Sequence, residues 1–174
     1  KILKADPKNI LALWQMGIIG LTSNNPQAAL DPLNTALSLS IRTDNQQVKG
    51  LLLLSIGITY RLLNKPQDAL DNYQQSIAIN ERLGQKRAVA AALDEVAQVQ
   101  TSTGKSAEAV KSYQHSLELL REIGMKKELG DTLLNMGVVL AARGQLDLAL
   151  QAYQDALQVG RETGDQNVEA QCLN

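Results

Sequence analysis

The segment Leu133–Leu157, LLNMGVVLAARGQLDLALQAYQDAL, contains two amphipathic helical patterns separated by Arg-Gly-Gln. A closely similar segment, LLSIGITYRLLNKPQDALDNYQQSI, occupies Leu53–Ile77. Because one pair of helices cannot bury its apolar faces alone, segments that recur in this way predict an array of stacked helix pairs. The recurrence, more than any single motif, decides the fold.

The recurrence has a fixed step of 40 residues through the whole chain. Four sets of positions keep this step: a small residue at Gly17, Gly57, Ala97 and Gly137; an alanine at Ala29, Ala69, Ala109 and Ala149; a large residue at Leu33, Tyr73, Tyr113 and Tyr153; and a leucine at Leu13, Leu53, Leu93 and Leu133. Small residues at a fixed place in each repeat indicate that two helices cross closely there.

The ends of the helices follow from residues that stop a helix. Asn24, Asn64, Gly104 and Gly144 separate the two helices of each pair, and Asp44, Gly84, Gly124 and Gly164 end the second helix. These residue types tolerate the left-handed backbone conformation of a helix C-terminus. The pattern therefore predicts first helices at about 10–23, 50–63, 90–103 and 130–143, and second helices at about 26–41, 66–83, 106–123 and 146–163.

The repeated positions resemble the tetratricopeptide repeat, in a variety that is 40 residues long. The matching residues in the second repeat are Leu53, Ile56, Gly57, Tyr60, Ala69, Tyr73 and Ser76, and those in the fourth repeat are Leu133, Met136, Gly137, Leu140, Ala149, Tyr153 and Ala156. The third repeat departs from the pattern at Ala97 and Gln100, and the first repeat has Leu33 in place of the aromatic residue. The resemblance implies an all-α fold: a right-handed superhelical solenoid of antiparallel helix hairpins. The expected array is similar to the arrays in Pins-type polarity adaptors, kinesin light chains and bacterial signalling proteins.

We expect residues 1–174 to form a single array. Its expected parts are the tail of a preceding repeat at 1–9, four repeats at about 10–49, 50–89, 90–129 and 130–169, and the start of a fifth repeat at 170–174. Such a fragment would have cut ends, through which self-association is expected.

Composition argues against several classes of function. The net charge of -1 gives no basic excess for binding nucleic acid or an anionic membrane surface. The longest apolar run, Gly50–Ile58, is too short to span a bilayer. A single cysteine, Cys172, forms no disulfide within the chain, which is compatible with a reducing compartment. We expect a cytoplasmic protein without nucleic-acid or membrane partners.

The residues for catalysis or metal binding do not come together in the sequence. His115 is the only histidine and is expected to face solvent, so neither a metal site nor a catalytic triad can be built around it. Asp94 and Glu95 are adjacent, but neighbouring side chains on a helix diverge by about 100°. No glycine-rich phosphate loop follows a strand. We therefore expect no cofactor, no metal and no enzymatic activity.

The resemblance implies instead that the first helices line a concave groove that binds a partner. The groove positions are Leu11, Trp14, Ile18, Leu51, Leu54, Ile58, Arg61, Asp94, Glu95, Gln98, Asp131, Asn135 and Val138. They are mostly apolar in the first two repeats, and the last two carry Asp94, Glu95 and Asp131, which suits a protein or peptide partner with apolar and basic residues. Equally, a preceding repeat or another segment of the same protein could cover the apolar positions, Trp14 among them.

The sequence thus favours a protein–protein interaction scaffold that holds a peptide or helix in its groove. An alternative is a regulatory or sensor segment of a larger signalling protein that acts on an adjacent catalytic domain. A third is a sensor whose superhelix tightens around a small peptide. A clamp for a C-terminal carboxylate is not expected, because Trp14, Leu54 and Asp94 replace the polar and basic residues that such a clamp requires.

Overall fold

The computed structural model describes residues 9–173, and all regular secondary structure in that range is α-helical. The helices are α2 (Ile10–Thr22), α3 (Pro26–Arg42), α4 (Gln46–Leu62), α5 (Pro66–Arg82), α6 (Lys86–Ser102), α7 (Ser106–Glu122), α8 (Lys126–Ala142), α9 (Leu146–Thr163) and α10 (Gln166–Leu173). The predicted all-α array of antiparallel helix hairpins is confirmed. The expected tail of a preceding repeat lies outside the described residues, apart from Asn9.

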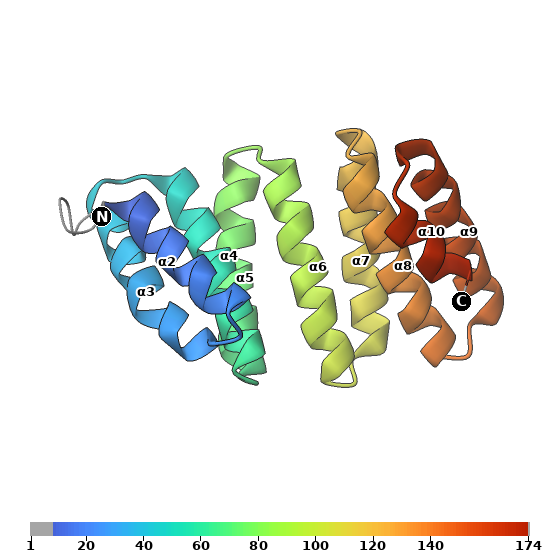
Figure 1. Ribbon diagram of the computed structural model, residues 1–174, viewed down its shortest axis with the longest axis horizontal. Helices are drawn as coiled ribbons and strands as arrows, with labels where there is room; N and C mark the ends of the chain where they lie inside the picture. The colour runs from blue at the N-terminus through green and yellow to red at the C-terminus, as the bar shows by residue number, and fades with distance from the viewer. Residues whose placement is uncertain (1–8, 174) are drawn as a thin grey trace. The chain divides into compact units, whose positions relative to one another are not determined.

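The chain divides into two compact units, Lys1–Ala88 and Val89–Asn174. In unit 1, α2 packs against α3 and α4 against α5, and α3 packs against α4. In unit 2, α8 packs against both α7 and α9, and α10 packs against α9. The members of each hairpin lie side by side and antiparallel in Figure 1. Each unit is therefore built from the hairpin contacts that the repeat predicts.

The turns lie at the predicted residues. Asn24, Asn64 and Gly104 adopt left-handed backbone φ values of 54°, 56° and 79°. In the first of these turns, the backbone N–H of Asn25 donates to the carbonyl oxygen of Gly20 at 2.9 Å. A left-handed residue followed by such a bond ends a helix and satisfies one of its last carbonyls.

The first helices of the later repeats begin four residues earlier than expected. We expected starts near residues 50, 90 and 130, whereas α4, α6 and α8 begin at Gln46, Lys86 and Lys126. Asn45 shows why in one case: its side-chain oxygen accepts a hydrogen bond from the backbone N–H of Val48 at 3.1 Å, which caps α4. Turns of three residues thus join helices of 17 residues, and the 40-residue period is unchanged.

The glycines of the small-residue positions are required by close packing. A Cβ atom at Gly57 would lie 2.4 Å from Cε1 of Tyr73, and one at Gly137 would lie 2.6 Å from Cε1 of Tyr153. In these two hairpins, the tyrosine of the second helix therefore fills the space that the glycine leaves. This contact holds the two helices of a hairpin together.

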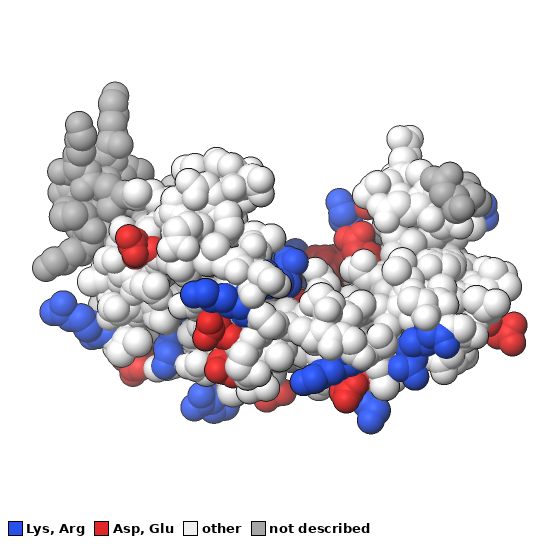
Figure 2. Space-filling view, turned by 90° about the horizontal axis from the view of Figure 1, so that it is seen from below, with Lys and Arg blue, Asp and Glu red and all other residues white. Residues whose placement is uncertain are grey.

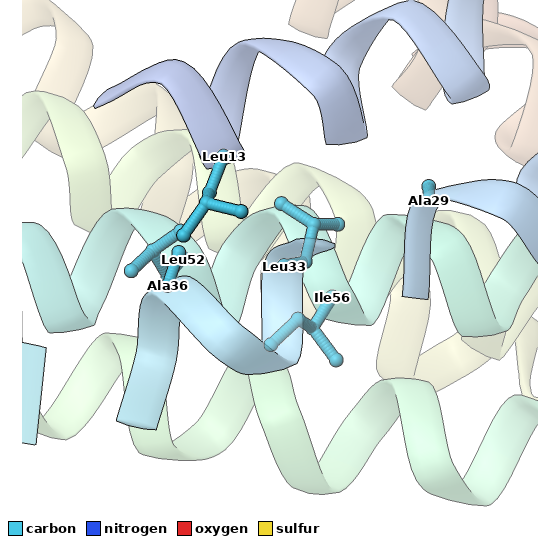
Figure 3. Packing of buried hydrophobic residues seen from close by; sticks show 6 residues of the cluster. All are labelled: Leu13, Ala29, Leu33, Ala36, Leu52 and Ile56. Carbon is cyan, nitrogen blue, oxygen red and sulfur yellow. The ribbon is translucent and has the colours of Figure 1, made fainter. Parts of the chain in front are cut away.

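The core of unit 1 lies between three helices. Leu13 of α2, Leu33 and Ala36 of α3, and Leu52 and Ile56 of α4 form a buried cluster, in which these side chains approach one another (Figure 3). All five are at most 7% exposed. Because buried side chains of α3 pack against both α2 and α4, α3 fixes the position of α4 relative to α2. It thereby positions the exposed faces of these two helices.

Replacing Asp44 with glycine should stabilise the protein. Asp44 has a φ of 49°, and the equivalent residues of the later repeats are Gly84, Gly124 and Gly164. Glycine adopts this conformation without steric cost, and we expect Asp44→Gly to raise the free energy of unfolding by about 0.5–1 kcal/mol. The exposed hydrogen bond from Gln46 Nε2 to Asp44 Oδ1, 2.7 Å long, is lost and subtracts little. Urea unfolding monitored by circular dichroism measures the change; a decrease would contradict the prediction.

Candidate functional site

One face of α2 exposes large apolar side chains. Leu11, Ile18 and Ile19 are 58%, 39% and 62% exposed. With Trp14 and Gln15 they line a shallow cavity of about 440 Å³. Their spacing of three, four and seven residues places them on one side of the helix. A contiguous apolar surface of this kind is unusual in a folded protein and often marks a binding site.

Trp14 is held in a defined orientation within this surface. Its indole Nε1–H donates to Oγ of Ser55 on α4 at 3.0 Å, and the Ser55 hydroxyl lies 3.1 Å from the carbonyl oxygen of Leu51, to which it donates. Ser55 is buried and Trp14 is half-buried. The predicted positions of the first two repeats therefore come together across α2 and α4, around a tryptophan whose ring is fixed.

The other predicted residues of unit 1 lie on α4. Leu51, Leu54 and Ile58 are half-buried and share a face of the helix with Ser55, and Arg61 follows one turn later and is also half-buried. This face continues the apolar surface of α2 onto α4. Sequence reasoning did not single out Ile19, which is the most exposed of the three exposed apolar side chains on α2 that line the shallow cavity.

The predicted residues of unit 2 lie on α6 and α8 and differ in exposure. Asp94, Glu95 and Gln98 on α6 are half-buried. On α8, Asp131 and Asn135 are exposed, and Val138 is 58% exposed.

The carboxylate of Asp94 is turned into the contact with α8. Its Oδ2 accepts a hydrogen bond from the hydroxyl of Thr132 at 2.6 Å, while its Oδ1 is buried and has no hydrogen-bond partner. Burial raises the pKa of Asp94 from 3.8 to about 6, against the opposing effect of the Thr132 and Ser116 hydroxyls. The negative charges of Glu95 and Asp131 also contribute to this increase in the pKa. This carboxylate is thus largely withdrawn from the surface on which we expected it.

Asp131 is the more accessible carboxylate of this pair. Partial burial raises its pKa, as does the nearby carboxylate of Asp165, and the ammonium group of Lys127 acts in the opposite direction. Lys127 itself forms an ion pair with Asp165 at 3.6 Å. Asp131 itself is exposed on the surface of α8.

The residues considered for catalysis or metal binding lie apart. His115 is exposed on α7, and Cys172 lies on α10, where burial raises the pKa of its thiol. Within residues 9–173, no group of three or more histidine, cysteine or acidic side chains is placed to hold a metal ion.

No helix in the same range is long and apolar enough to cross a bilayer. On the face shown in Figure 2, basic and acidic side chains are interspersed.

A second hollow, which sequence reasoning missed, lies in unit 2 between α7 and α9. It has a volume of about 730 Å³. Its apolar lining is formed by Val110 and Leu117 of α7, Leu133, Met136 and Leu140 of α8, and Leu148 and Ala152 of α9. Because these residues are spread over three helices, no single stretch of the sequence indicated the hollow.

Comparison with known proteins identifies the repeat. Residues 48–122 and 129–163 match two sequence models that are both described as tetratricopeptide repeat, and together they cover more than half of the chain. No curated protein matches the sequence.

Several solved structures share the fold. A crystal structure of MamA is 20% identical over 94% of this chain and 85% of its own length, with a TM-score of 0.71. A Rap protein complexed with competence and sporulation factor is 14% identical over 92% of this chain and 45% of its own, with a TM-score of 0.86. A signal transduction ATPase with numerous domains from Pyrococcus horikoshii, described as having a tetratricopeptide repeat sensor, is 22% identical over 96% of this chain and 25% of its own, with a TM-score of 0.84. The chain thus spans less than half of the last two proteins.

Proposed function

Because the chain belongs to the tetratricopeptide repeat family, we propose that it is a protein-interaction scaffold that binds a segment of a partner and has no catalytic activity of its own. The observation that carries this proposal is the exposed apolar surface of α2 around Trp14. The partner is a peptide or helix whose apolar side chains cover Leu11, Trp14 and Ile18, and extend to Leu54 and Ile58 on α4.

The geometry of Trp14 supports its role as an anchor. A large aromatic side chain contributes much contact area for few rotatable bonds, and its contribution to binding is greatest where its orientation is set in advance. The hydrogen bond to Ser55 sets the orientation of the Trp14 ring while leaving part of the ring accessible. Binding of a partner therefore costs little side-chain entropy at Trp14.

In unit 2 we propose that a basic side chain of a partner approaches the exposed carboxylate of Asp131, with Asn135 beside it as a hydrogen-bonding group. Asp94 serves this purpose less well, because its carboxylate is engaged with Thr132 or buried. A charge at the rim of an interface mainly affects the rate of association and its dependence on salt.

Truncation of the proposed anchor should weaken binding. We expect Trp14→Ala to weaken binding of the partner by about 1–3 kcal/mol, as is usual for interface anchors, and Leu54→Ala to act in the same direction. His115→Ala is the matched control, since His115 is exposed on α7, far from α2 in sequence and on the other unit. The measurement is isothermal titration of each variant with a partner captured by the full-length protein. Unchanged affinity of Trp14→Ala would show that the partner uses another surface.

A second candidate is a regulatory segment whose apolar surface is covered by another part of the same polypeptide. The description of one structural neighbour as an ATPase with a tetratricopeptide repeat sensor favours this alternative. Labelling of Trp14 by an oxidising reagent in the intact protein distinguishes the two. Protection without any added partner supports the regulatory role, and protection only after addition of a partner supports the scaffold.

A further inference from the structure

The residues that line the hollow between α7 and α9 differ from the residues at the equivalent repeat positions of unit 1. Positions 80 residues apart are equivalent, so Leu140, Gln145 and Leu148 correspond to Tyr60, Lys65 and Asp68. In unit 1, the ring of Tyr60 packs against the buried cluster around Leu33, and the Lys65 ammonium lies 5.8 Å from the ring centroid. Leu140 is smaller than tyrosine and is only 4% exposed, so in unit 2 it contributes to the floor of the hollow.

Two further residues on α9 make the hollow more apolar. Ala152 replaces the half-buried Asn72 of unit 1, and Leu148, which replaces Asp68, is 56% exposed. An exposed leucine beside an unfilled apolar hollow loses favourable contact area that a ligand could restore. These Leu and Ala residues line a cavity of about 730 Å³, a size typical of binding sites.

At three positions the rim of the hollow carries a cation where the equivalent residue of unit 1 is not basic, although Gln145 stands in place of Lys65. Lys111 and Arg121 on α7 and Arg143 in the turn before α9 line it. The equivalent residues of unit 1 are Asp31, Ile41 and Leu63.

The acidic residues of the rim offset only part of the charge of these cations. Asp155 Oδ1 accepts a hydrogen bond from Gln151 at 2.7 Å, and Glu118 is the second carboxylate. Three cations against two carboxylates leave the rim with a net positive charge. The apolar centre and basic rim together favour a ligand that is apolar in the middle and acidic at its edges.

The secondary structure of the ligand follows from the walls of the hollow. The described walls are helices, whose backbone N–H and C=O groups are paired within the helix, so they offer no open sheet edge to an extended strand. An amphipathic helix satisfies its own backbone and presents side chains at spacings of three, four and seven residues to an apolar groove.

We propose that the hollow between α7 and α9 is a second docking site, which binds an acidic amphipathic helix of a partner protein. Leu148, with the half-buried Val110 and Met136, receives the apolar face of that helix above a floor that includes the buried Leu140 and Ala152. Lys111, Arg121 and Arg143 pair with its carboxylates. The site lies entirely within unit 2 and is independent of the surface around Trp14 in unit 1.

The experiment selects binders from a displayed library of amphipathic helical peptides with randomised apolar and flanking positions, using the whole chain as the target. Selected peptides are labelled and titrated by fluorescence anisotropy. We expect enriched sequences with aliphatic residues on one face and glutamate or aspartate beside it. Their affinity should fall about tenfold or more in Leu148→Asp, which introduces the residue type found at Asp68. Leu140→Tyr, which introduces the residue type of Tyr60, should weaken binding similarly by filling the hollow.

Charge reversal tests the rim separately. Lys111→Glu should weaken binding several-fold and reduce its dependence on salt, because the carboxylates of the peptide lose their counter-charge. Lys49→Glu on α4 makes the same change of net charge outside the hollow and should leave affinity unchanged. Thermal unfolding of each variant verifies the fold.

Three results would overturn the proposal: no enrichment above background, enrichment of helices with basic flanks, or peptides that bind Leu148→Asp and Leu140→Tyr as tightly as the unaltered chain. Peptides whose binding is lost in Trp14→Ala instead would belong to the surface of unit 1. The failure of one site is therefore distinguishable from the failure of the other.

Discussion

Gly137→Leu should lower the free energy of unfolding by about 3 kcal/mol or more, near the upper end of the usual cost of overpacking a core. A Cβ atom at position 137 would already lie 2.6 Å from Cε1 and 2.9 Å from Cδ1 of Tyr153. Tyr153 packs with Leu140, Ala149 and Ala152, so its ring cannot move without disturbing the contact between α8 and α9. The measurement is urea unfolding of the whole chain, followed by circular dichroism.

Gly137→Ala is the matched control, and the third repeat indicates its outcome. There Ala97 faces Tyr113 in a well-buried cluster, so this hairpin geometry accommodates one methyl group after a small adjustment. Alanine also favours a helix interior over glycine by about 0.5–1 kcal/mol, which offsets part of the strain. We expect the alanine variant to remain within about 1 kcal/mol of the unaltered chain. If both variants lost the same stability, the steric explanation would be wrong.

The positions of the turns and the small-residue contacts could be predicted from the sequence because each depends on one residue type. Left-handed backbone at residues 24, 64 and 104 requires asparagine or glycine, and the close contact at Gly57 excludes a side chain. Such requirements recur with the period and are visible without coordinates. The extra first turn of α4 was missed, although Asn45 beside Asp44 is a recognisable capping residue.

Other features depend on side-chain direction and on several helices at once. Helix period places Asp94 on the exposed face of α6, but the short bond to Thr132 draws its carboxylate toward α8. The hollow between α7 and α9 is lined by residues of three helices, α8 among them, so it could be recognised only once these helices were placed together. Ile18 and Leu11 are exposed in the structure, whereas their contact with a partner stays a prediction.

Asp94→Leu should stabilise the protein at neutral pH. The equivalent residues Trp14, Leu54 and Leu134 show that this position of the repeat accepts a large apolar side chain. Leucine removes the buried, unpaired Oδ1 atom, and it leaves no new unpaired group, because the Thr132 hydroxyl also lies 3.0 Å from the carbonyl oxygen of Glu128 and can donate there. Replacing a buried charge that lacks a counter-ion by an apolar residue is favourable.

The pH dependence gives the sharper test. A folded-state pKa of about 6, above the ordinary value of 3.8, means that the folded protein binds the Asp94 proton more tightly than the unfolded chain does. The stability contributed by the protonated carboxyl is fully present below pH 3.8 and is lost as the pH rises to 6 and beyond. This pKa difference corresponds to about 3 kcal/mol at most.

Asp94→Asn keeps the shape of the side chain and removes its titration. Since Glu95, Asp131 and the other carboxyl groups remain, subtracting the unfolding free energy of the unaltered chain from that of this variant isolates Asp94. We expect the difference to be small near pH 4, to grow in favour of asparagine between pH 4 and 6, and to level off above pH 7 at about 2–3 kcal/mol. Urea unfolding at matched ionic strength across this range measures it. A difference that does not change with pH would mean that the Asp94 carboxylate is hydrated and that its contact with α8 is not maintained in solution.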